Sequence, residues 1–409
     1  MRTIPEPARN IPVIATYDVL VCGAGPAGVS AALAASRAGA RTGLIETYGC
    51  LGGIWTTGAL AYFLDYANKS GIMAEIIVRL EEQEARGRNS ERKGTNTFDV
   101  ESVKVLLDDM CLAEGVDIRL HTRACGTHVV DGRIQHVITE SKSGRQALAA
   151  KVVIDCTGDG DVAALAGCGF ELGHPDTGVM QPMSLICLLT GISRSEARPF
   201  YREGTEPWSE AKERLKEAME AGGFSPSYTR PSLFPVRDNL YILMANHQYG
   251  VDGTCAEDVT RATLEGRREL NNLIDGLRST GGVWQNIRLV ATAGQIGVRE
   301  GRRIHGKYTV RLDDMLEGRE HDDAVCKVTF GIDIHATDPI KGKAIESHEH
   351  RIRPYDIPLR ALIARDVEGM MMAGRCISGD FLAHSSYRVT GNASAIGEAA
   401  GRYAARGEI

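Results

Sequence analysis

The first clear pattern of apolar residues lies in residues 17–46, which read YDVLVCGAGPAGVSAALAASRAGARTGLIE. The apolar run Val19 to Cys22 has the composition of a buried strand, and an alanine-rich stretch over 27–40 has that of a helix. A second short apolar run ends at Glu46. This order predicts a strand, a helix and a second strand, with a glycine-rich turn between the first two.

The turn, Gly23-Ala24-Gly25-Pro26-Ala27-Gly28, fits the fingerprint of a dinucleotide-binding unit. Gly23 permits the tight turn, Gly25 lets the backbone approach a pyrophosphate, and Gly28 lets helix and strand pack closely. The helix N-terminus presents free N–H groups and a partial positive charge to phosphates. Glu46, at the end of the second strand, is where a carboxylate takes the ribose hydroxyls.

The rest of the chain alternates between helical and strand patterns. Helices are expected over 72–86, 99–114, 207–221, 256–278 and 392–405. Strands are expected over 116–121, 151–155, 183–191 and 370–373, and the Asp-Gly pair at 131–132 predicts a hairpin. Three prolines favour an extended lead-in over residues 1–15, and residues 313–365 have no clear pattern.

Length and charge narrow the class of protein. A chain of 409 residues has room for two or three domains, and its net charge of −6 offers no basic surface to nucleic acid. Ten cysteines without a CxxC pair argue against a zinc ribbon, an iron–sulfur ligand set or a disulfide framework. We therefore expect reduced thiols, no metal site and no nucleic-acid partner.

Two further absences bear on where the protein acts. No apolar run approaches the roughly 20 residues that a membrane helix needs. The first residues, MRTIPEPARNIP, lack the apolar core of a signal peptide. We expect a cytoplasmic protein without a membrane partner, and the sequence leaves a homo-oligomer open.

The end of the chain returns to a glycine-rich strand–loop–helix pattern. A strand over 370–373 leads into Gly374 and a final helix. This suggests a nucleotide-binding domain assembled from both ends of the chain, with a second domain inserted between. We expect an FAD-binding domain over 16–180 and 366–409, and a substrate or cap domain over 181–365.

Four more segments carry a family resemblance. They are Leu51-Gly52-Gly53, the CTGDGDVA run at 156–163, the IGVREGRR run at 296–303, and the C-terminal runs AGRCIS (373–378), AHSSYRV (383–389) and AIGEAAG (395–401). Together with the GAGPAG turn, they resemble the FAD-dependent oxidoreductase family of the glutathione-reductase-like superfamily over about residues 17–405. The resemblance implies FAD as cofactor and an α/β fold: a Rossmann-like FAD-binding domain of the glutathione-reductase type with an inserted α+β substrate domain.

The resemblance also implies which residues hold FAD. Gly52 and Gly53 would let the chain pass close to the ribityl and flavin, Ala124 would mark the backbone that holds adenine, and Asp380 would bind the ribityl chain. The N-terminus of the final helix would point at the flavin C2 carbonyl and stabilise negative charge on the reduced ring. The full set of expected cofactor-binding residues is Gly23, Gly25, Pro26, Ala27, Gly28, Glu46, Gly52, Gly53, Ala124, Gly158, Asp159, Gly374, Asp380, Asn392 and Ala393.

The run at 158–163 has a second interpretation. It also fits G-x-G-x-x-A after a strand, which is the pattern of a separate NAD(P)H site. Asp159 and Asp161 would place like charge beside phosphates, and no acid-ended strand follows at the required spacing. Both observations argue against a second nucleotide domain.

His384 and Arg388 precede the final helix and are expected in a loop near the flavin. His384 has the ordinary pKa of a general base, and Arg388 could bind a carboxylate or stabilise an alkoxide. The alternative is that both residues hold the loop to the FAD phosphates. His335 is a second candidate base, because Asp333 and His335 would share one face of a strand; a structural hydrogen bond is its alternative.

Three arginines form a third candidate group. Arg299 and Arg303 would share a helical face, and Arg302 lies beside them. The group could bind an anion or pair with local acids; we assign the anion role to Arg302 and the structural role to Arg303.

Cysteine chemistry at the flavin is restricted. Disulfide reductases carry two cysteines spaced by four residues after the di-glycine turn, and here the partner of Cys50 is replaced by Trp55, which excludes dithiol chemistry. Covalent attachment of the flavin through Cys50 or Cys376 is a further alternative.

These residues predict an FAD-dependent dehydrogenase or oxidase that removes hydride from a small polar hydroxylated or carboxylated substrate and passes electrons to an acceptor. One alternative is a flavin-dependent reductase of an enoate or ketone fed by NAD(P)H. Another is a flavoprotein component of a larger electron-transfer or RNA-modification assembly. Residues 192–290 are expected to form much of the substrate pocket.

Overall fold

A computed structural model describes residues 2–86, 96–202, 207–337 and 350–407. Its largest sheet has seven strands in the order β3-β2-β1-β6-β5-β4, with β15 paired on β6. The strands are β1 (Val13–Cys22), β2 (Thr42–Ile45), β3 (Asp117–Arg119), β4 (Arg123–Val130), β5 (Arg133–Ser141), β6 (Gly144–Asp155) and β15 (Met370–Met372).

Strand β6 belongs to two parts of this sheet. Its first half pairs antiparallel with β5, and β5 with β4, around the predicted Asp-Gly hairpin. Its second half runs parallel to β1 and β15, while β2 and β3 extend the parallel part on the other side. Cys22, Ile45, Asp155 and Met372 stand in register at the carboxyl ends of these strands. Ligands of parallel α/β sheets bind at that edge.

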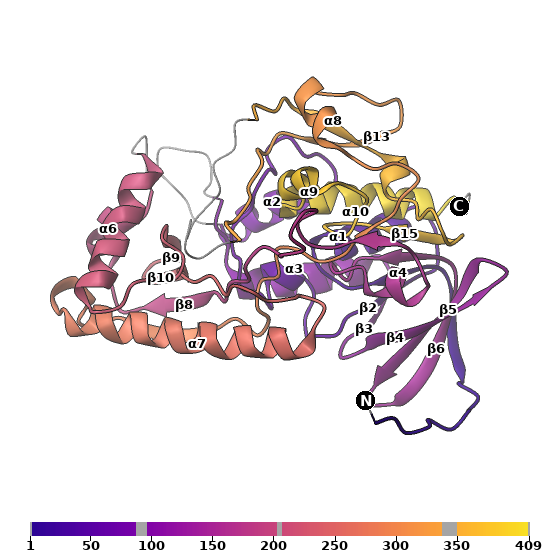
Figure 1. Cartoon of the computed structure of the whole chain (residues 1–409), viewed down its shortest axis with the longest axis horizontal. Helices are drawn as coiled ribbons and strands as arrows, with labels where there is room; N and C mark the ends of the chain where they lie inside the picture. The colour runs from indigo at the N-terminus through magenta and orange to yellow at the C-terminus, as the bar shows by residue number, and fades with distance from the viewer. Residues whose placement is uncertain (1, 87–95, 203–206, 338–349, 408–409) are drawn as a thin grey trace.

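Helix α1 (Pro26–Arg37) packs against the final helix α10 (Thr390–Ala404), so the two ends of the chain meet. The helices approach closely because a Cβ on Gly397 would lie 2.0 Å from the carbonyl oxygen of Ala27. Ser30 Oγ and Ser394 Oγ, both buried, are 2.7 Å apart. Helices α1 and α10 therefore form one body, although nearly the whole chain separates them in sequence (Figure 1).

A second sheet lies to one side of the first and is antiparallel, in the order β11-β8-β10-β9 (Figure 1). Its strands are β8 (Cys187–Thr190), β9 (Ser232–Arg237), β10 (Leu240–Met244) and β11 (Arg288–Thr292), and α6 (Trp208–Ala221) and α7 (Ala256–Ser279) lie with it. One face of α7 is buried, and Gly266 lets it approach the sheet, because a Cβ there would lie 3.1 Å from the Leu185 Cβ.

After the four-stranded sheet, the chain runs back toward the seven-stranded sheet. Gly297 bridges to Ser184, and β12 (Arg303–Ile304) pairs with β7 (Phe170–Glu171). The N–H of Ile304 then donates to the carbonyl of Cys376 at 3.0 Å. The remaining elements are α2 (Ile72–Glu82), α3 (Val100–Ala113), α4 (Asp161–Leu165), α5 (Arg194–Ala197), α8 (Leu312–Glu317), α9 (Phe381–Tyr387), β13 (Ala324–Val328) and β14 (Tyr355–Pro358).

Several elements differ from the sequence expectations. β1 begins at Val13, inside the expected lead-in, and the strand expected over 183–191 is confined to Cys187–Thr190. The segment expected as a loop before the last helix contains α9. The expected mixed α/β fold with a parallel Rossmann-like sheet is confirmed. In the described parts of the chain, no helix combines the length and apolar character that crossing a membrane requires.

Candidate active site

The glycine turn after β1 leaves room for a ligand at the carboxyl edge of the parallel sheet. Gly23 has a φ of +94°, and a Cβ on it would lie 2.5 Å from the carbonyl oxygen of Cys156. A Cβ on Gly28 would lie 1.8 Å from the carbonyl oxygen of Gly23, whereas one on Gly25 would meet no atom within 4 Å. Helix α1 has Pro26 in its first turn and no side-chain cap. Its first N–H groups are therefore free of side-chain acceptors and suit phosphate oxygens.

Glu46 follows β2 and is nearly buried. Its Oε2 accepts a hydrogen bond from the N–H of Ala24 at 2.7 Å, and its Oε1 from the N–H of Tyr48 at 2.9 Å. Burial raises the pKa of this carboxyl, while these backbone donors act in the opposite direction. Each oxygen keeps a lone pair for a hydroxyl donor. The N–H of Thr122 donates to the Glu46 carbonyl at 2.8 Å, which brings Ala124, at the start of β4, close to this residue.

The di-glycine segment packs against the first turn. Gly52, with a φ of +102°, donates its N–H to the carbonyl of Ala24 at 2.8 Å. A Cβ on Gly53 would lie 2.8 Å from the Gly25 Cα. A side chain at position 53 would therefore collide with the backbone of the first turn, and the close approach predicted for this segment depends on glycine.

The turns that follow β6 and β15 lie beside the glycine turn and the di-glycine segment. Gly158 and Gly374 both have positive φ, +83° and +91°, and a Cβ on Gly374 would lie 3.2 Å from the Cβ of Ala27. Asp159 pairs with Arg375 at 2.6 Å and so joins the turn after β6 to the turn after β15. We call residues 23–28, 46, 52–53, 158–159 and 374 the nucleotide cradle.

The N-terminus of α10 carries buried polar atoms without protein partners. Asn392 is completely buried, and its Nδ2 meets no hydrogen-bond acceptor among the described residues; the same is true of Thr390 Oγ1. The N–H of Ala393 is already bonded to the carbonyl of Val389 at 3.0 Å. An unpaired amide donor at a helix N-terminus is suited to an acceptor such as a ring carbonyl. The cradle and this helix end therefore fit an FAD molecule.

Asp380 is the N-cap of α9. Its Oδ1 accepts from the N–H of Ala383 at 2.7 Å, and its Oδ2 from the N–H of Leu312 at 2.8 Å. The carboxylate thus holds α8 and α9 together, and its binding to a ribityl chain stays a prediction.

A series of hydrogen-bonded side chains connects residues that follow β10 to the C-terminal end of α9. His335 Nε2 is 3.3 Å from Asp333 Oδ2, and His335 Nδ1 is 3.0 Å from His247 Nε2. His247 Nδ1 is in turn 3.2 Å from the hydroxyl of Tyr249. Arg388 donates to the Asp333 carbonyl at 2.7 Å. We call these five residues the His335 cluster.

Gln181 fixes this geometry. Its Oε1 accepts from the N–H of His335 at 3.0 Å and from Arg388 Nη2 at 3.2 Å, and its Nε2 donates to Ser385 Oγ at 3.1 Å. The side chain joins the segment before β8 to the His335 segment and to α9. The His335 cluster is therefore held by residues from three distant parts of the sequence.

The segment that leads to Arg299 adjoins the segment that leaves the di-glycine turn. The carbonyl of Thr57 accepts from the N–H of Gln295 at 3.1 Å, and a Cβ on Gly297 would lie 3.5 Å from Ile54 Cδ1. Arg299 follows two residues later, and its Nη1 donates to the Pro182 carbonyl at 2.6 Å. Pro182 follows Gln181, so Arg299 connects the segment that packs beside the di-glycine turn to the residue that fixes the His335 cluster.

A family model described as FAD dependent oxidoreductase matches residues 18–407. The chain belongs to this family. The match confirms the family that the motifs indicated, its cofactor FAD, and the expectation of an enzyme. No curated protein matches the chain.

The FAD-dependent oxidoreductase also resembles several solved structures. A geranylgeranyl bacteriochlorophyll reductase-like protein from Thermoplasma acidophilum is 14% identical, with a TM-score of 0.46 over 96% of this chain and 77% of that one. A myxobacterial chondrochloren halogenase is also 14% identical, with a TM-score of 0.47 over 91% and 71%. The p-nitrophenol 4-monooxygenase from Pseudomonas putida DLL-E4 is 16% identical, with a TM-score of 0.42 over 72% and 70%.

Burial and neighbouring cations control the charges of the His335 cluster. Burial, followed by the charge of Arg299, lowers the pKa of His335 to about 3, and the same two causes lower the pKa of His247. Burial would raise the pKa of Asp333, but His335, Arg388 and Arg299 together lower it. At neutral pH the oxidoreductase therefore holds two neutral imidazoles beside one carboxylate.

His384 lies in α9, not in a loop, and is completely buried. Neither ring nitrogen has a hydrogen-bond partner among the described residues. Burial, followed by the charge of Arg303, lowers the pKa of His384 well below its usual value. His384 is therefore neutral and separate from the hydrogen bonds of the His335 cluster, and its role as base stays a prediction.

The arginine run at 299–303 is not helical, so the expected shared helical face is wrong. Arg302 donates to Asp161 at 2.9 Å and to the Asp159 carbonyl at 3.0 Å. Arg303 forms a buried ion pair with Glu300 at 2.7 Å. Both arginines are thus engaged by local groups, and Arg299 is the one beside the His335 cluster.

The segment that holds Asp333 and His335 forms no named strand in the structure, which corrects the expectation of one. The two side chains still meet, because residues two apart in an extended chain point to the same side. His247 and Tyr249 lie within the range 192–290 that was expected to form much of the substrate pocket, and Arg299 belongs to the expected arginine group, although none of the three was assigned a catalytic role.

The cysteines take no disulfide partner; all ten are free. Cys50 lies beside Thr57, with Sγ and Oγ1 3.2 Å apart, and Cys376 is buried with its Sγ 3.5 Å from the Asp155 carbonyl. Burial raises the pKa of the Cys376 thiol well above its usual value. Within the described ranges, no group of three His, Cys, Asp or Glu side chains is arranged to hold a metal ion.

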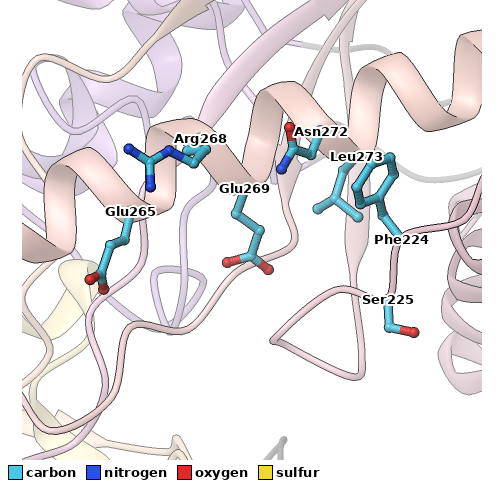
Figure 2. Close-up of a pocket in the computed structure, with 7 residues that line it drawn as sticks. All are labelled: Phe224, Ser225, Glu265, Arg268, Glu269, Asn272 and Leu273. Atoms are coloured by element: carbon cyan, nitrogen blue, oxygen red, sulfur yellow. The ribbon is translucent and has the colours of Figure 1, made fainter.

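A separate cavity of about 210 Å³ lies between α7 and the loop that follows α6 (Figure 2). Glu265 and Glu269 project from α7 toward the same side, and Phe224 and Ser225 approach from the loop after α6. Glu269 is already bonded to the N–H of Ser227 at 2.7 Å. The Glu269 carboxylate thus anchors a loop.

Proposed function

We propose that this FAD-dependent oxidoreductase removes hydride from a small substrate that carries a hydroxyl beside a carboxylate. The observation that supports this is the His335 cluster itself: an ionised Asp333 and a neutral His335 lie beside Arg388 and Arg299. A base next to fixed cations is the arrangement that a hydroxy acid requires, because its carboxylate must be bound while its hydroxyl loses a proton.

The arginines bind and orient the substrate. Arg388 lies 3.6 Å from the Asp333 carboxylate, and its Nε is buried without a partner among the described residues. Arg299 donates through Nη1 to the Pro182 carbonyl. Both guanidinium groups therefore keep N–H donors for a substrate carboxylate, which a planar fork binds through two parallel hydrogen bonds.

Bound FAD supplies the hydride acceptor of this chemistry. The proton of the substrate hydroxyl passes to the Asp333–His335 pair. With both histidines neutral, one arrangement of protons satisfies the chain: the Tyr249 hydroxyl donates to His247 Nδ1, His247 Nε2 to His335 Nδ1, and His335 Nε2 to Asp333. Every bond in this series is donated toward Asp333, so the series stabilises the carboxylate, which takes up the substrate proton on a lone pair that His335 leaves free. Tyr249, the outermost donor, is partly exposed.

We further propose that separate parts of the chain bind the cofactor and the substrate, as expected from the sequence. Residues 16–180 and 366–409 would bind FAD in the manner of the glutathione-reductase type, and residues 181–365 would supply the substrate side. The location of His247, Arg299 and His335 within the inserted segment supports this, as does the close packing of α1 on α10.

The experiment is an anaerobic screen of the purified holoprotein against a panel of small hydroxy acids, alcohols and enoates, followed by the absorbance of bound FAD. We expect a hydroxy acid to bleach the flavin bands, and His335→Asn to slow bleaching by about 10²-fold or more. Bleaching by NAD(P)H alone, with no response to any hydroxy acid, would instead assign the reductase alternative. Protein that neither carries nor takes up FAD would refute both.

A further inference from the structure

Lys212, a lysine of one of the helices beside the second sheet, lies near the His335 cluster and has no acidic partner among the residues that the structure describes. Lys212 lies in α6 and is partly buried, with its Nζ 4.3 Å from the ring centroid of Trp208 and 5.9 Å from that of Tyr228. In the described parts of the chain, no hydrogen bond or ion pair reaches this ammonium group. Two aromatic rings thus hold it in place while its three donors stay unused.

Tyr228 connects this lysine to the His335 cluster. Its ring centroid lies 4.3 Å from that of His247 and 5.8 Å from that of His335. Burial, followed by the charge of Arg230, lowers the pKa of Lys212 to about 8, while Asp333 acts in the opposite direction. The ammonium group is therefore near enough to Asp333 to sense its charge, across the face of the Tyr228 ring.

Positive charge exceeds negative charge around Tyr228. Lys212, Arg299 and Arg388 all interact with the carboxylate of Asp333, and among the described residues no other acid interacts with all three. Glu300, which also acts on Arg388, is bound at its two oxygens by Arg303 and by the N–H of Gln181. Partly buried cations in proteins are normally paired, because an unpaired buried charge is costly.

We propose that the substrate carries a second carboxylate and that Lys212 binds it, so that this oxidoreductase acts on small hydroxy dicarboxylates. The inference rests on the proposed function, which assigns the first carboxylate to Arg388 and Arg299. The second carboxylate would lie over the Tyr228 ring, and its negative charge would balance the excess of positive charge there. A lysine suits this position because its compact ammonium group accepts a carboxylate from several directions.

The test uses the holoprotein with succinate and butyrate, which share a four-carbon chain and differ in one carboxylate. Binding is followed by the change in absorbance of bound FAD. Protection of Lys212 against reductive methylation, measured by mass spectrometry of its peptide, gives a readout that does not depend on activity. We expect succinate to bind about tenfold more tightly than butyrate, the value of one additional charge-assisted hydrogen bond, and to protect Lys212.

Two variants complete the design. Lys212→Met keeps the length of the side chain and removes the charge, and should lower succinate affinity to that of butyrate without changing butyrate binding. Lys216→Met is the matched control on the same helix, because Lys216 pairs with Glu213 at 3.0 Å. It should leave both affinities unchanged.

Three outcomes would overturn the dicarboxylate assignment while leaving the proposed function intact: equal binding of the two acids, equal weakening of both in Lys212→Met, or protection of Lys212 by inorganic phosphate as strong as by succinate. Failure of both acids to perturb bound FAD or to protect Lys212 would refute the proposed function together with it.

Discussion

At the scale of single residues, Glu46 is the carboxylate expected to bind the cofactor. Its two oxygens accept hydrogen bonds from the N–H of Ala24, in the turn after β1, and from that of Tyr48, just after β2, so the carboxylate is fixed before any ligand arrives. A side chain that already serves two backbone donors cannot be replaced by an amide without leaving one of them facing an NH₂ group.

We therefore expect Glu46→Gln to weaken FAD binding by about 10- to 100-fold, the cost of one or two charge-assisted hydrogen bonds. Titration of FAD into the apoprotein, followed by quenching of flavin fluorescence, measures the change. Glu368→Gln, at an exposed position, is the control and should bind FAD as the native protein does. Unchanged affinity in Glu46→Gln would show that the ribose contact lies elsewhere.

His335 makes stability depend on pH. Its pKa is about 3 in the folded protein and about 6.5 when exposed to water, so between these values the unfolded chain binds the additional proton. Stability contributed by this residue is thus complete above about pH 6.5 and is lost as the pH falls toward 3.

Replacing His335 should flatten that dependence. We expect His335→Asn to reduce the slope of the unfolding free energy between pH 6 and 5 by up to about 1.4 kcal/mol per pH unit. Urea denaturation at a series of pH values provides the measurement. Gln83→Asn, at an exposed residue that carries no titratable group, should leave the slope as it is. An equal slope in His335→Asn and the native protein would contradict the buried, neutral state of this imidazole.

The turns of the nucleotide cradle could be predicted because each is encoded by residues close together in sequence, while the binding of FAD by these residues stays a prediction. Gly23, Gly25 and Gly28 lie in one turn, and Glu46 ends the next strand. The contact between His335 and His247 joins residues 88 apart that share no local pattern. Spacing rules also misled at Arg299 and Arg303, because an i,i+4 relation has meaning only on a helix and this segment is not helical.

At the scale of elements, periodicity predicted the long helices and buried strands well, since each is long enough to display its repeat. α7, with its buried face, was expected over 256–278 and spans Ala256–Ser279. The short helix α9 was missed, because seven residues show hardly two turns. The segment at 313–365 had no pattern because α8, β13 and β14 are short and stabilised by contacts with distant elements.

The nucleotide cradle depends on the close packing of α1 against α10. A Cβ on Gly401 would lie 2.1 Å from the carbonyl oxygen of Ala31, within the backbone of the partner helix. Because backbone cannot move aside as a flexible side chain does, we expect Gly401→Ala to destabilise the protein by about 2 kcal/mol or more.

The measurement is the unfolding free energy from urea denaturation. Gly331→Ala is the matched control, since a Cβ there would meet no atom within 4 Å. It should change stability by less than about 0.5 kcal/mol, as surface substitutions usually do. Equal stability of Gly401→Ala and the native protein would mean that the two helices do not pack this closely.

At the scale of the whole molecule, the two ends of the chain are expected to contact the cofactor, whereas the helix that packs on the inserted sheet is not. Residues 23–28 begin α1, and Asn392 lies in the first turn of α10, so FAD would contact both terminal segments at once. α7 packs on the second sheet and contributes nothing to the nucleotide cradle. A ligand that binds only the folded cradle stabilises the elements that form it by mass action.

Hydrogen exchange of the apoprotein and the holoprotein should therefore change in two separate stretches of sequence together. We expect FAD at about 100 times its Kd to slow exchange in both α1 and α10, by up to the ~2.7 kcal/mol that mass action allows, and to affect α7 much less. Peptides from α7 are the internal control for a general change in stability. Protection of α1 without α10 would separate the C-terminal helix from the cofactor, and the assignment of Asn392 to the flavin would then be wrong. Joint protection would show that one ligand holds the two ends of the chain together.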